Sequence, residues 1–194
     1  MDLPCFIKAT FKQILLGDLV VMKNEKGFSL IELLIVVVII GIIAAIAIPN
    51  LRAARRSANE GSTISALRTI HGGQQTYAST HGRGDYAGAV AGLDGVGLTQ
   101  LGATQIIDST LASGTKSGYI YTTGTTSAST TLPATFCTRT IPTVNSGVTA
   151  TGTRCFGVAT DGVIMTNTAT SVANCGCSIG GGGQFVDRSS PMGN

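Results

Sequence analysis

An uninterrupted apolar run from Phe28 to Ile48, FSLIELLIVVVIIGIIAAIAI, constrains what this chain can fold into more than any other feature. Its only polar side chains are those of Ser29 and Glu32, and Pro49 follows it directly. As an α-helix, a run of this length spans about 31 Å, which matches the hydrocarbon core of a bilayer. A cleaved secretory signal is the competing interpretation, but its apolar stretch is usually shorter, at about 7 to 15 residues. We therefore expect a membrane-spanning helix here.

Glu32 is the one carboxylate inside the run, and a charge in this position needs a partner. Placing an ionised carboxylate in lipid is costly unless it is paired or neutralised. One interpretation is a protonated side chain, or one that snorkels to the membrane edge; the other is an ion pair with a second chain in an assembly. The flanking cations do not decide the orientation of the helix, because two precede the run and three follow it: Lys23, Lys26, Arg52, Arg55 and Arg56.

The composition argues against an enzyme and against a nucleic-acid binder. The chain has 194 residues, a formal net charge of +3, only 12% charged residues and a mean hydropathy of +0.34. Two His, few acids and no Trp leave little material for acid–base or metal chemistry. The length suits one domain with an appendage. We therefore predict no catalytic residue, no cofactor, no metal and no specific nucleic-acid site.

The residues around Gly27 resemble the N-terminal signature of type IV pilins and of the related type II secretion pseudopilins. That signature is a short basic leader ending in Gly, then Phe, then a Glu four residues further on, and an apolar helix with an internal Gly and a Pro at its far end. Gly27, Phe28, Glu32, Gly41 and Pro49 supply every element.

The resemblance implies how the N-terminus is processed and used. A membrane peptidase of the prepilin type would cut on the cytoplasmic side between Gly27 and Phe28, and the new Phe28 amine would be N-methylated. Glu32 of an incoming subunit would then pair with that amine on a neighbour, which provides the partner that the carboxylate needs. The helix would bend or melt at Gly41 and Pro49, since glycine lowers helix propensity and proline removes a hydrogen-bond donor.

The leader itself predicts a start at Met22. Starting there gives MKNEKG, a short leader with two lysines, and residues 1–21 would then lie upstream of the true start. The alternative is a genuine extended leader with a second amphipathic stretch over residues 6–21. In both cases residues 1–27 are absent from the mature chain, and Cys5 is lost with them.

Beyond Pro49 we expect the helix to continue to residue 80, because no further proline interrupts it and larger apolar residues recur along one stripe. That stripe comprises Leu51, Ile64, Leu67, Ile70 and Tyr77. The expected domains are a leader at 1–27, a transmembrane and assembly helix at 28–49, an amphipathic continuation at 50–80 and a globular head at 81–194.

The composition shifts to Gly, Thr, Ser and Ala after residue 80, and short strands with turn signals follow. We expect short helical pieces near residues 98–101 and 106–111, and a strong hairpin turn at Asp161-Gly162. The low-complexity run 122–131 is interpreted as a solvated hairpin or loop, and the glycine run 180–183 as a flexible segment. The expected fold class is α+β, a long helix whose second half packs on a small antiparallel sheet with strands at 119–123, 135–140, 154–160 and 163–166.

Four cysteines remain in the head, at Cys137, Cys155, Cys175 and Cys177. Four cysteines permit three connectivities, and a two-residue separation rarely gives an unstrained bridge. We therefore expect Cys175 and Cys177 each to reach one of the other two, in a pairing that the sequence leaves open. A zinc site is the alternative, but the Cys-x-Cys spacing is unusual for zinc and no His lies near.

The predicted function is that of a structural subunit of a type IV pilus, polymerised through its apolar helix. The alternative is a pseudopilin of a type II secretion system, and the third hypothesis is a membrane-anchored enzyme or binding domain. The expected partners are further copies of the chain, the inner membrane, the prepilin peptidase and N-methyltransferase, and an assembly machinery with a separate ATPase. The subunit would reside in the inner membrane, with its N-terminus cytoplasmic, before it enters a surface pilus or a periplasmic pseudopilus.

Overall fold

The structure is a computed structural model of the chain and describes residues 27–88, 95–168, 178–179 and 185–186. The expected leader, Cys175, Cys177 and the glycine run 180–183 lie outside the described residues, apart from Gly27. The helices are α2 (Leu30–Thr80), α3 (Val96–Ala103) and α4 (Ser109–Ala112). The strands are β1 (Thr115–Lys116), β2 (Tyr119–Thr126), β3 (Thr135–Pro142), β4 (Arg154–Ala159), β5 (Ile164–Thr168), β6 (Ser178–Ile179) and β7 (Phe185–Val186). The chain divides into two compact units, Met1–Ile46 and Ala47–Asn194.

In the first unit, the described part of the chain after Ser29 is helical throughout. None of its described residues is buried, and its large apolar side chains lie on all sides of α2. Among the described residues, α2 is the one helix that is long and apolar enough to cross a membrane. It is uniformly apolar in this part, which is the pattern of a membrane span or of a helix inside a bundle.

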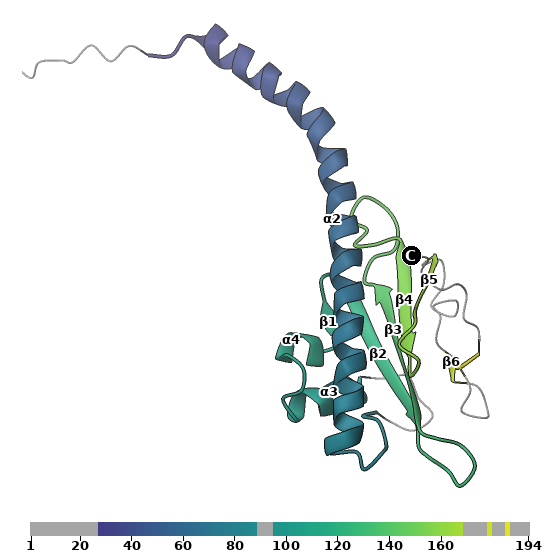
Figure 1. The fold of residues 1–194 in the computed structure, drawn as a ribbon. Helices are drawn as coiled ribbons and strands as arrows, with labels where there is room; N and C mark the ends of the chain where they lie inside the picture. The colour runs from purple at the N-terminus through teal and green to yellow at the C-terminus, as the bar shows by residue number, and fades with distance from the viewer. Residues whose placement is uncertain (1–26, 89–94, 169–177, 180–184, 187–194) are drawn as a thin grey trace, which may run out of the picture. The chain divides into compact units, whose positions relative to one another are not determined.

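The second unit is built on a five-stranded antiparallel sheet in the order β1-β2-β3-β4-β5, so that each strand pairs with the next along the chain (Figure 1). The register places Thr122 opposite Arg139 and Phe156 opposite Thr166. A separate two-stranded sheet pairs β6 with β7. This local connectivity fits the short turn-separated strands of the sequence, because antiparallel neighbours need only hairpin connections.

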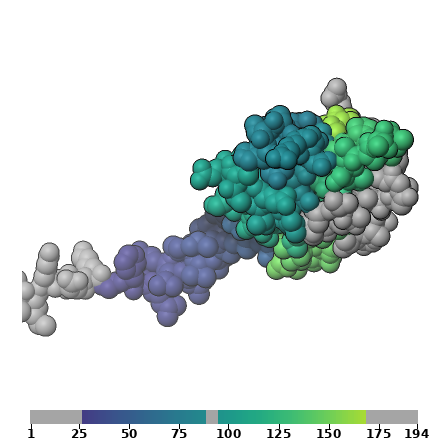
Figure 2. Space-filling model, turned by 90° about the horizontal axis from the view of Figure 1, so that it is seen from below, coloured from purple at the N-terminus to yellow at the C-terminus, as the bar shows by residue number. Residues whose placement is uncertain are grey.

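The core of the second unit lies between the C-terminal half of α2 and the sheet. Leu67 and Ile70 of α2 are fully buried, and they belong to one apolar cluster with Tyr119, Tyr121 and Phe156 of the sheet. α3 and α4 add further apolar residues to the same cluster: Leu98, Leu101 and Leu111. The opposite face of these α2 turns stays on the surface of the unit (Figure 2). The predicted packing of the helix on a small antiparallel sheet is confirmed, and with it the α+β class.

The four predicted strands are confirmed as β2 to β5, with bounds that differ by at most a few residues. The predicted hairpin at Asp161-Gly162 joins β4 to β5, but its connection is longer than a two-residue turn, because the last paired residues are Val158 and Ile164. Gly162 adopts a positive φ of 75° there, which glycine tolerates without strain. The helical piece at 98–101 is confirmed within α3. The second piece is shorter than predicted, because Ile106 and Ile107 are not helical and α4 begins only at Ser109.

The low-complexity run 122–131 belongs to a hairpin, which was one of its two interpretations, because β2 runs to Thr126 and pairs with β3. Its first half is not solvated as predicted, since Thr123 and Thr125 are buried. Threonine is β-branched and favours strands, and the Thr123 hydroxyl is satisfied by that of Thr138 on the neighbouring strand, at 2.8 Å. Leu51 is 53% exposed and lies before the buried part of α2, which begins at Glu60.

Cys137 on β3 and Cys155 on β4 are buried. They do not bridge one another, because Cys137 lies opposite Ala159, four positions from Cys155 and therefore about 13 Å along the strand. A disulfide requires Cα atoms within about 7 Å. The predicted cross-links are therefore not confirmed within the part of the chain that the structure describes. The pairing of Cys137 and Cys155 with Cys175 and Cys177 stays a prediction.

Candidate functional site

Residues 27–29 have no regular secondary structure and lie immediately before the first turn of α2. Gly27 is exposed, and the Phe28 side chain is 90% exposed. A peptidase requires an accessible, non-helical segment at the bond that it cuts. The predicted cleavage position between Gly27 and Phe28 meets that requirement.

Glu32 lies one turn further on and caps the N-terminus of the helix. Its Oε2 accepts a hydrogen bond from the backbone N–H of Ser29 at 3.0 Å. Ser29 precedes the first helical residue and Glu32 is the third, which is the spacing of a capping box. The helix N-terminus also favours a negative charge through its dipole. The carboxylate is thus held in place by its own backbone while it stays exposed to a partner.

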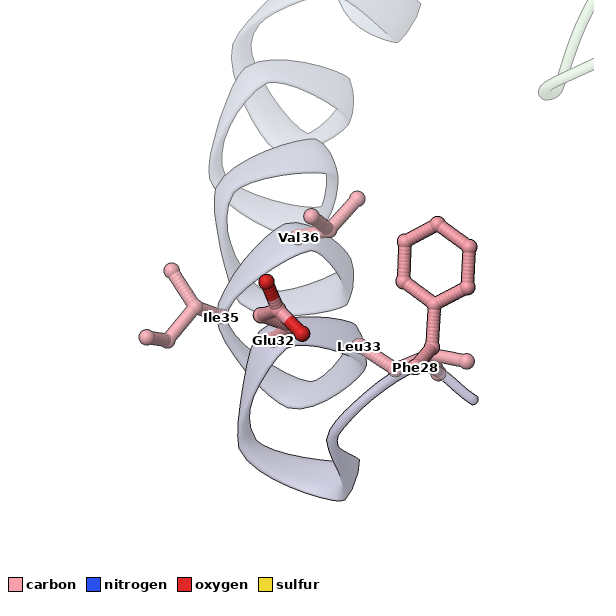
Figure 3. Close-up of a pocket in the computed structure, with 5 residues that line it drawn as sticks. All are labelled: Phe28, Glu32, Leu33, Ile35 and Val36. Carbon is pink, nitrogen blue, oxygen red and sulfur yellow. The ribbon is translucent and has the colours of Figure 1, made fainter. Parts of the chain in front are cut away.

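The side chains around this carboxylate form a shallow apolar groove on the outside of the helix. Figure 3 shows the Phe28 ring and the Ile35 side chain on opposite sides of the Glu32 carboxylate, with Leu33 and Val36 completing the lining. A charge surrounded by apolar side chains, as this one is, would lose its water when another apolar surface covers it, and it would then require a cation.

Gly41 and Pro49 lie inside α2, which is helical through both positions. Space is open where a Cβ of residue 41 would project, so no packing within the chain requires the glycine. Pro49 has no N–H, so the helix lacks one of its internal hydrogen bonds at this point. The bending or melting predicted at these two residues stays a prediction.

A second polar site, on the head, is one that the sequence interpretation missed. Glu60 of α2 is buried, with 6% of the residue exposed, and its side chain accepts five hydrogen bonds from the start of β4 and the residue before it. Its Oε1 accepts from the backbone N–H groups of Thr153 and Arg154 at 3.0 and 3.3 Å, and from the Thr153 hydroxyl at 3.1 Å. Its Oε2 accepts from the Arg154 guanidinium at 2.9 and 2.7 Å. This carboxylate fastens α2 to the sheet.

The electrostatics of this cluster favour the ionised carboxylate. Burial opposes ionisation of Glu60, but the hydrogen bonds from Thr153 and Arg154 and the Arg154 charge outweigh it and lower the pKa of Glu60. Tyr119 donates its hydroxyl to the Arg154 carbonyl at 2.9 Å, and burial together with the Glu60 charge raises the pKa of Tyr119. Gly152 is needed beside this ring, because a Cβ there would collide with the Tyr119 hydroxyl.

Gln74 makes a comparable attachment nearer the end of α2. It is fully buried, its Nε2 donates to the Ala87 carbonyl, and its Oε1 accepts from the Ala87 N–H, both at 2.8 Å. No short-range pattern in the sequence distinguishes Glu60 or Gln74 from an exposed polar residue. A polar residue in register with Leu67 and Ile70 was the available signal, since it lies on the buried face of the helix.

No group of three or more His, Cys, Asp or Glu side chains is arranged to hold a metal ion within the part of the chain that the structure describes. The zinc alternative for Cys137 and Cys155 involves Cys175 and Cys177, which lie outside that part.

Comparison with known proteins finds matches over about the N-terminal third of the chain. Residues 22–48 match the family described as the prokaryotic N-terminal methylation motif. The chain is 52% identical over 56 residues to the type IV wide pilus major component PilA4 of Thermus thermophilus, which covers 29% of this chain and 43% of that protein. The N-terminal segment is therefore similar to that of type IV pilins and pseudopilins.

Two further relatives show that the segment is shared by both branches of this family. A fimbrial protein of Pseudomonas aeruginosa is 57% identical over 51 residues, covering 25% of this chain and 33% of that protein. The type II secretion system core protein G of Klebsiella pneumoniae is 31% identical over 62 residues, covering 32% of this chain and 44% of that protein. The chain thus spans less than half the length of the curated relatives it matches. No solved structure matches the chain at a significant level.

Proposed function

We propose that the chain is a structural subunit of a type IV pilus filament, polymerised through the apolar helix at residues 28–49. The observation that carries this proposal is the exposure of the most apolar part of the molecule. Every large apolar side chain from Leu30 to Ile48 is between 47% and 82% exposed. Burying one such side chain fully contributes about 1.5–3 kcal/mol, so a helix of this kind is stable only in lipid or among other helices.

Processing at the N-terminus prepares the subunit for this assembly. A prepilin peptidase cuts between Gly27 and Phe28, and the freed Phe28 amine is N-methylated. The Glu32 carboxylate of an incoming subunit then pairs with that amine on a neighbour. Its Oε1 accepts no hydrogen bond from a described residue, so this oxygen is available to the amine while Oε2 stays bonded to Ser29.

The proposed interface joins unlike surfaces of identical subunits. A head-to-tail contact that does not close into a ring produces an open filament. Before assembly the subunit resides in the inner membrane with its N-terminus in the cytoplasm. A separate ATPase provides the energy that moves it from the membrane into the filament. A surface filament of this kind would serve adhesion, twitching motility or DNA uptake.

Two disulfides stabilise the head in this proposal. Since Cys137 and Cys155 cannot bridge each other, each pairs with one of Cys175 and Cys177. Such bridges persist on the non-cytoplasmic side of the membrane, where the head resides. They fasten the C-terminal region to the middle of the sheet.

A pseudopilin of a type II secretion system is the alternative, and the matches to core protein G favour it. The N-terminal chemistry is the same in both cases. The difference is where the polymer ends, since a pseudopilus stays in the periplasm and a pilus extends from the cell surface.

Deleting the gene and counting surface fibres by electron microscopy tests the proposal. We expect loss of the fibres, recovery with the unaltered gene, and no recovery with a Gly27 variant that the peptidase does not cut. Fibres that persist in the deletion strain, combined with a failure to secrete folded proteins, would support the pseudopilin instead.

A further inference from the structure

Three arginines lie just beyond the apolar run, at Arg52, Arg55 and Arg56, and the sequence has no acidic residue between Glu32 and Glu60. Arg52 follows Ile48 by four residues of α2, so it lies about 6 Å along the helix from the end of the run. In the proposed topology these cations lie on the non-cytoplasmic side. Arginine and lysine are usually enriched on the opposite, cytoplasmic side. We therefore expect an anionic partner that binds this cluster.

One of the three arginines is used within the head. Arg56 Nη2 donates to the Gly147 carbonyl at 3.1 Å, and Asn59 Nδ2 donates to the Thr151 carbonyl at 2.9 Å. These contacts hold the loop between β3 and β4 against α2 (Figure 1). Arg52 and Arg55 are exposed, and neither forms an ion pair with a carboxylate of the described residues.

The two remaining arginines line a groove between α2 and this loop. Its other walls are Asn59 and residues 148–151, and its volume is about 340 Å³, at the lower end of small-molecule sites. The lining contains two guanidinium groups and no carboxylate. At the rim of the groove, Val148 exposes 61% of its apolar side chain. A pair of cations beside an exposed apolar side chain is suited to the surface of a membrane, where charged headgroups lie next to hydrocarbon.

We propose that the groove lined by Arg52 and Arg55 binds the phosphate of an anionic phospholipid headgroup while the subunit resides in the membrane before assembly. The guanidinium fork donates two parallel hydrogen bonds to phosphate oxygens, and Val148 enters the interfacial layer next to them. This inference rests on the membrane insertion in the proposed function. It adds a lipid ligand for the head, which must be released when the subunit leaves the membrane.

Native mass spectrometry of the full chain, purified in detergent, tests the inference. The probes are phosphatidylglycerol and phosphatidylcholine with identical acyl chains, and the readout is the ratio of the two lipids retained. Each arginine near an anionic surface contributes about a fivefold preference, so we expect the ratio to fall by about 25-fold in the Arg52→Gln, Arg55→Gln double variant. The matched control is the Arg68→Gln, Arg83→Gln double variant, which removes the same charge from exposed positions elsewhere on the head and should keep the ratio of the unaltered chain.

Three outcomes would overturn the proposal. An unchanged lipid ratio in the Arg52, Arg55 variant would show that the groove does not bind the headgroup, and an equal fall in the control would show only a general charge effect. Glycerol phosphate that displaces the lipid at equal concentration would make the groove a small-anion site. Filament formation and N-terminal processing are scored separately on the same variants, so a chain that binds lipid but forms no fibres would contradict the proposed function alone.

Discussion

Two glutamates on the same helix differ in where their carboxylates find hydrogen-bond donors. Glu60 receives five hydrogen bonds within its own chain, from Thr153 and Arg154. Glu32 receives one, from the Ser29 N–H, and lies on an exposed apolar surface. The first is therefore a structural residue of the head, and the second is available to another molecule.

The Glu60 cluster predicts how the stability of the head depends on pH. The folded chain lowers the pKa of Glu60, so the ionised carboxylate stabilises the head above the unfolded pKa of about 4.3, and this stabilisation is lost as the pH falls through the folded pKa. We expect Glu60→Gln to reduce the free energy of unfolding by about 1–3 kcal/mol at pH 7. Thermal unfolding followed by the near-UV signal of the buried tyrosines measures it.

The matched control for this experiment is Glu32→Gln, which leaves the head untouched and should unfold like the parent chain. The difference between the parent and Glu60→Gln should shrink as the pH falls below about 4.3. A difference that is constant from pH 7 to pH 3 would contradict the role of the ionised carboxylate.

Glu32 itself predicts a defect in assembly without a defect in processing. Removing one partner of a buried ion pair costs about 3–5 kcal/mol, or more than about a hundredfold in a contact constant. We expect Glu32→Ala to insert and be cleaved normally while surface fibres disappear. Fibre counts together with the mass of the membrane-bound chain measure both steps. Arg68→Gln, an exposed charge change on the same helix, should assemble normally; abundant fibres from Glu32→Ala would refute the ion pair.

At the scale of elements, the sequence predicted those parts that depend on local patterns. Strands β2 to β5 alternate or contain β-branched residues and end at turn signals, and α3 carries Leu98 and Leu101 on one face. The attachments made by Glu60 and Gln74 were not predicted, because Glu60 and Arg154 are 94 positions apart and the helix stripe was defined by apolar residues alone. The composition of the run 122–131 predicted a solvated hairpin or loop, but the threonines in its first half are buried and pair across strands.

The half of α2 that packs on the sheet predicts a contrast between two leucines. Leu67 is fully buried and Leu51 is 53% exposed. We expect Leu67→Ala to destabilise the head by about 2–5 kcal/mol, through lost burial and a cavity, and Leu51→Ala to change it by less than about 0.5 kcal/mol. The same tyrosine-based unfolding experiment compares them. Equal effects of the two substitutions would contradict the packing of α2 on the sheet.

At the scale of the whole molecule, the two units differ in what they need from their surroundings. The unit from Ala47 onward has its own apolar core, whereas the described part of the first unit buries none of its residues. The family motif at residues 22–48 lies almost entirely in the first unit, and the relatives include both pilins and a type II secretion protein. This explains why the polymer-forming end was predictable from sequence and why the type of filament was not.

The proposed disulfides predict a definite peptide map. Non-reducing digestion should link a Cys137 peptide and a Cys155 peptide separately to Cys175 and Cys177, with no direct link between Cys137 and Cys155. Tandem mass spectrometry identifies the pairs, and the digest of the reduced chain is its control. A Cys137–Cys155 peptide would contradict the strand register.

The central claim is that this chain is cut after Gly27 and polymerised at the cell surface. Intact mass spectrometry of filaments sheared from cells, with and without reductant, tests it most directly. The account predicts a chain that begins at N-methylated Phe28 and is four hydrogens lighter before reduction, because two disulfides have formed. A chain that is present only in membranes and still carries residues before Phe28 would contradict the account.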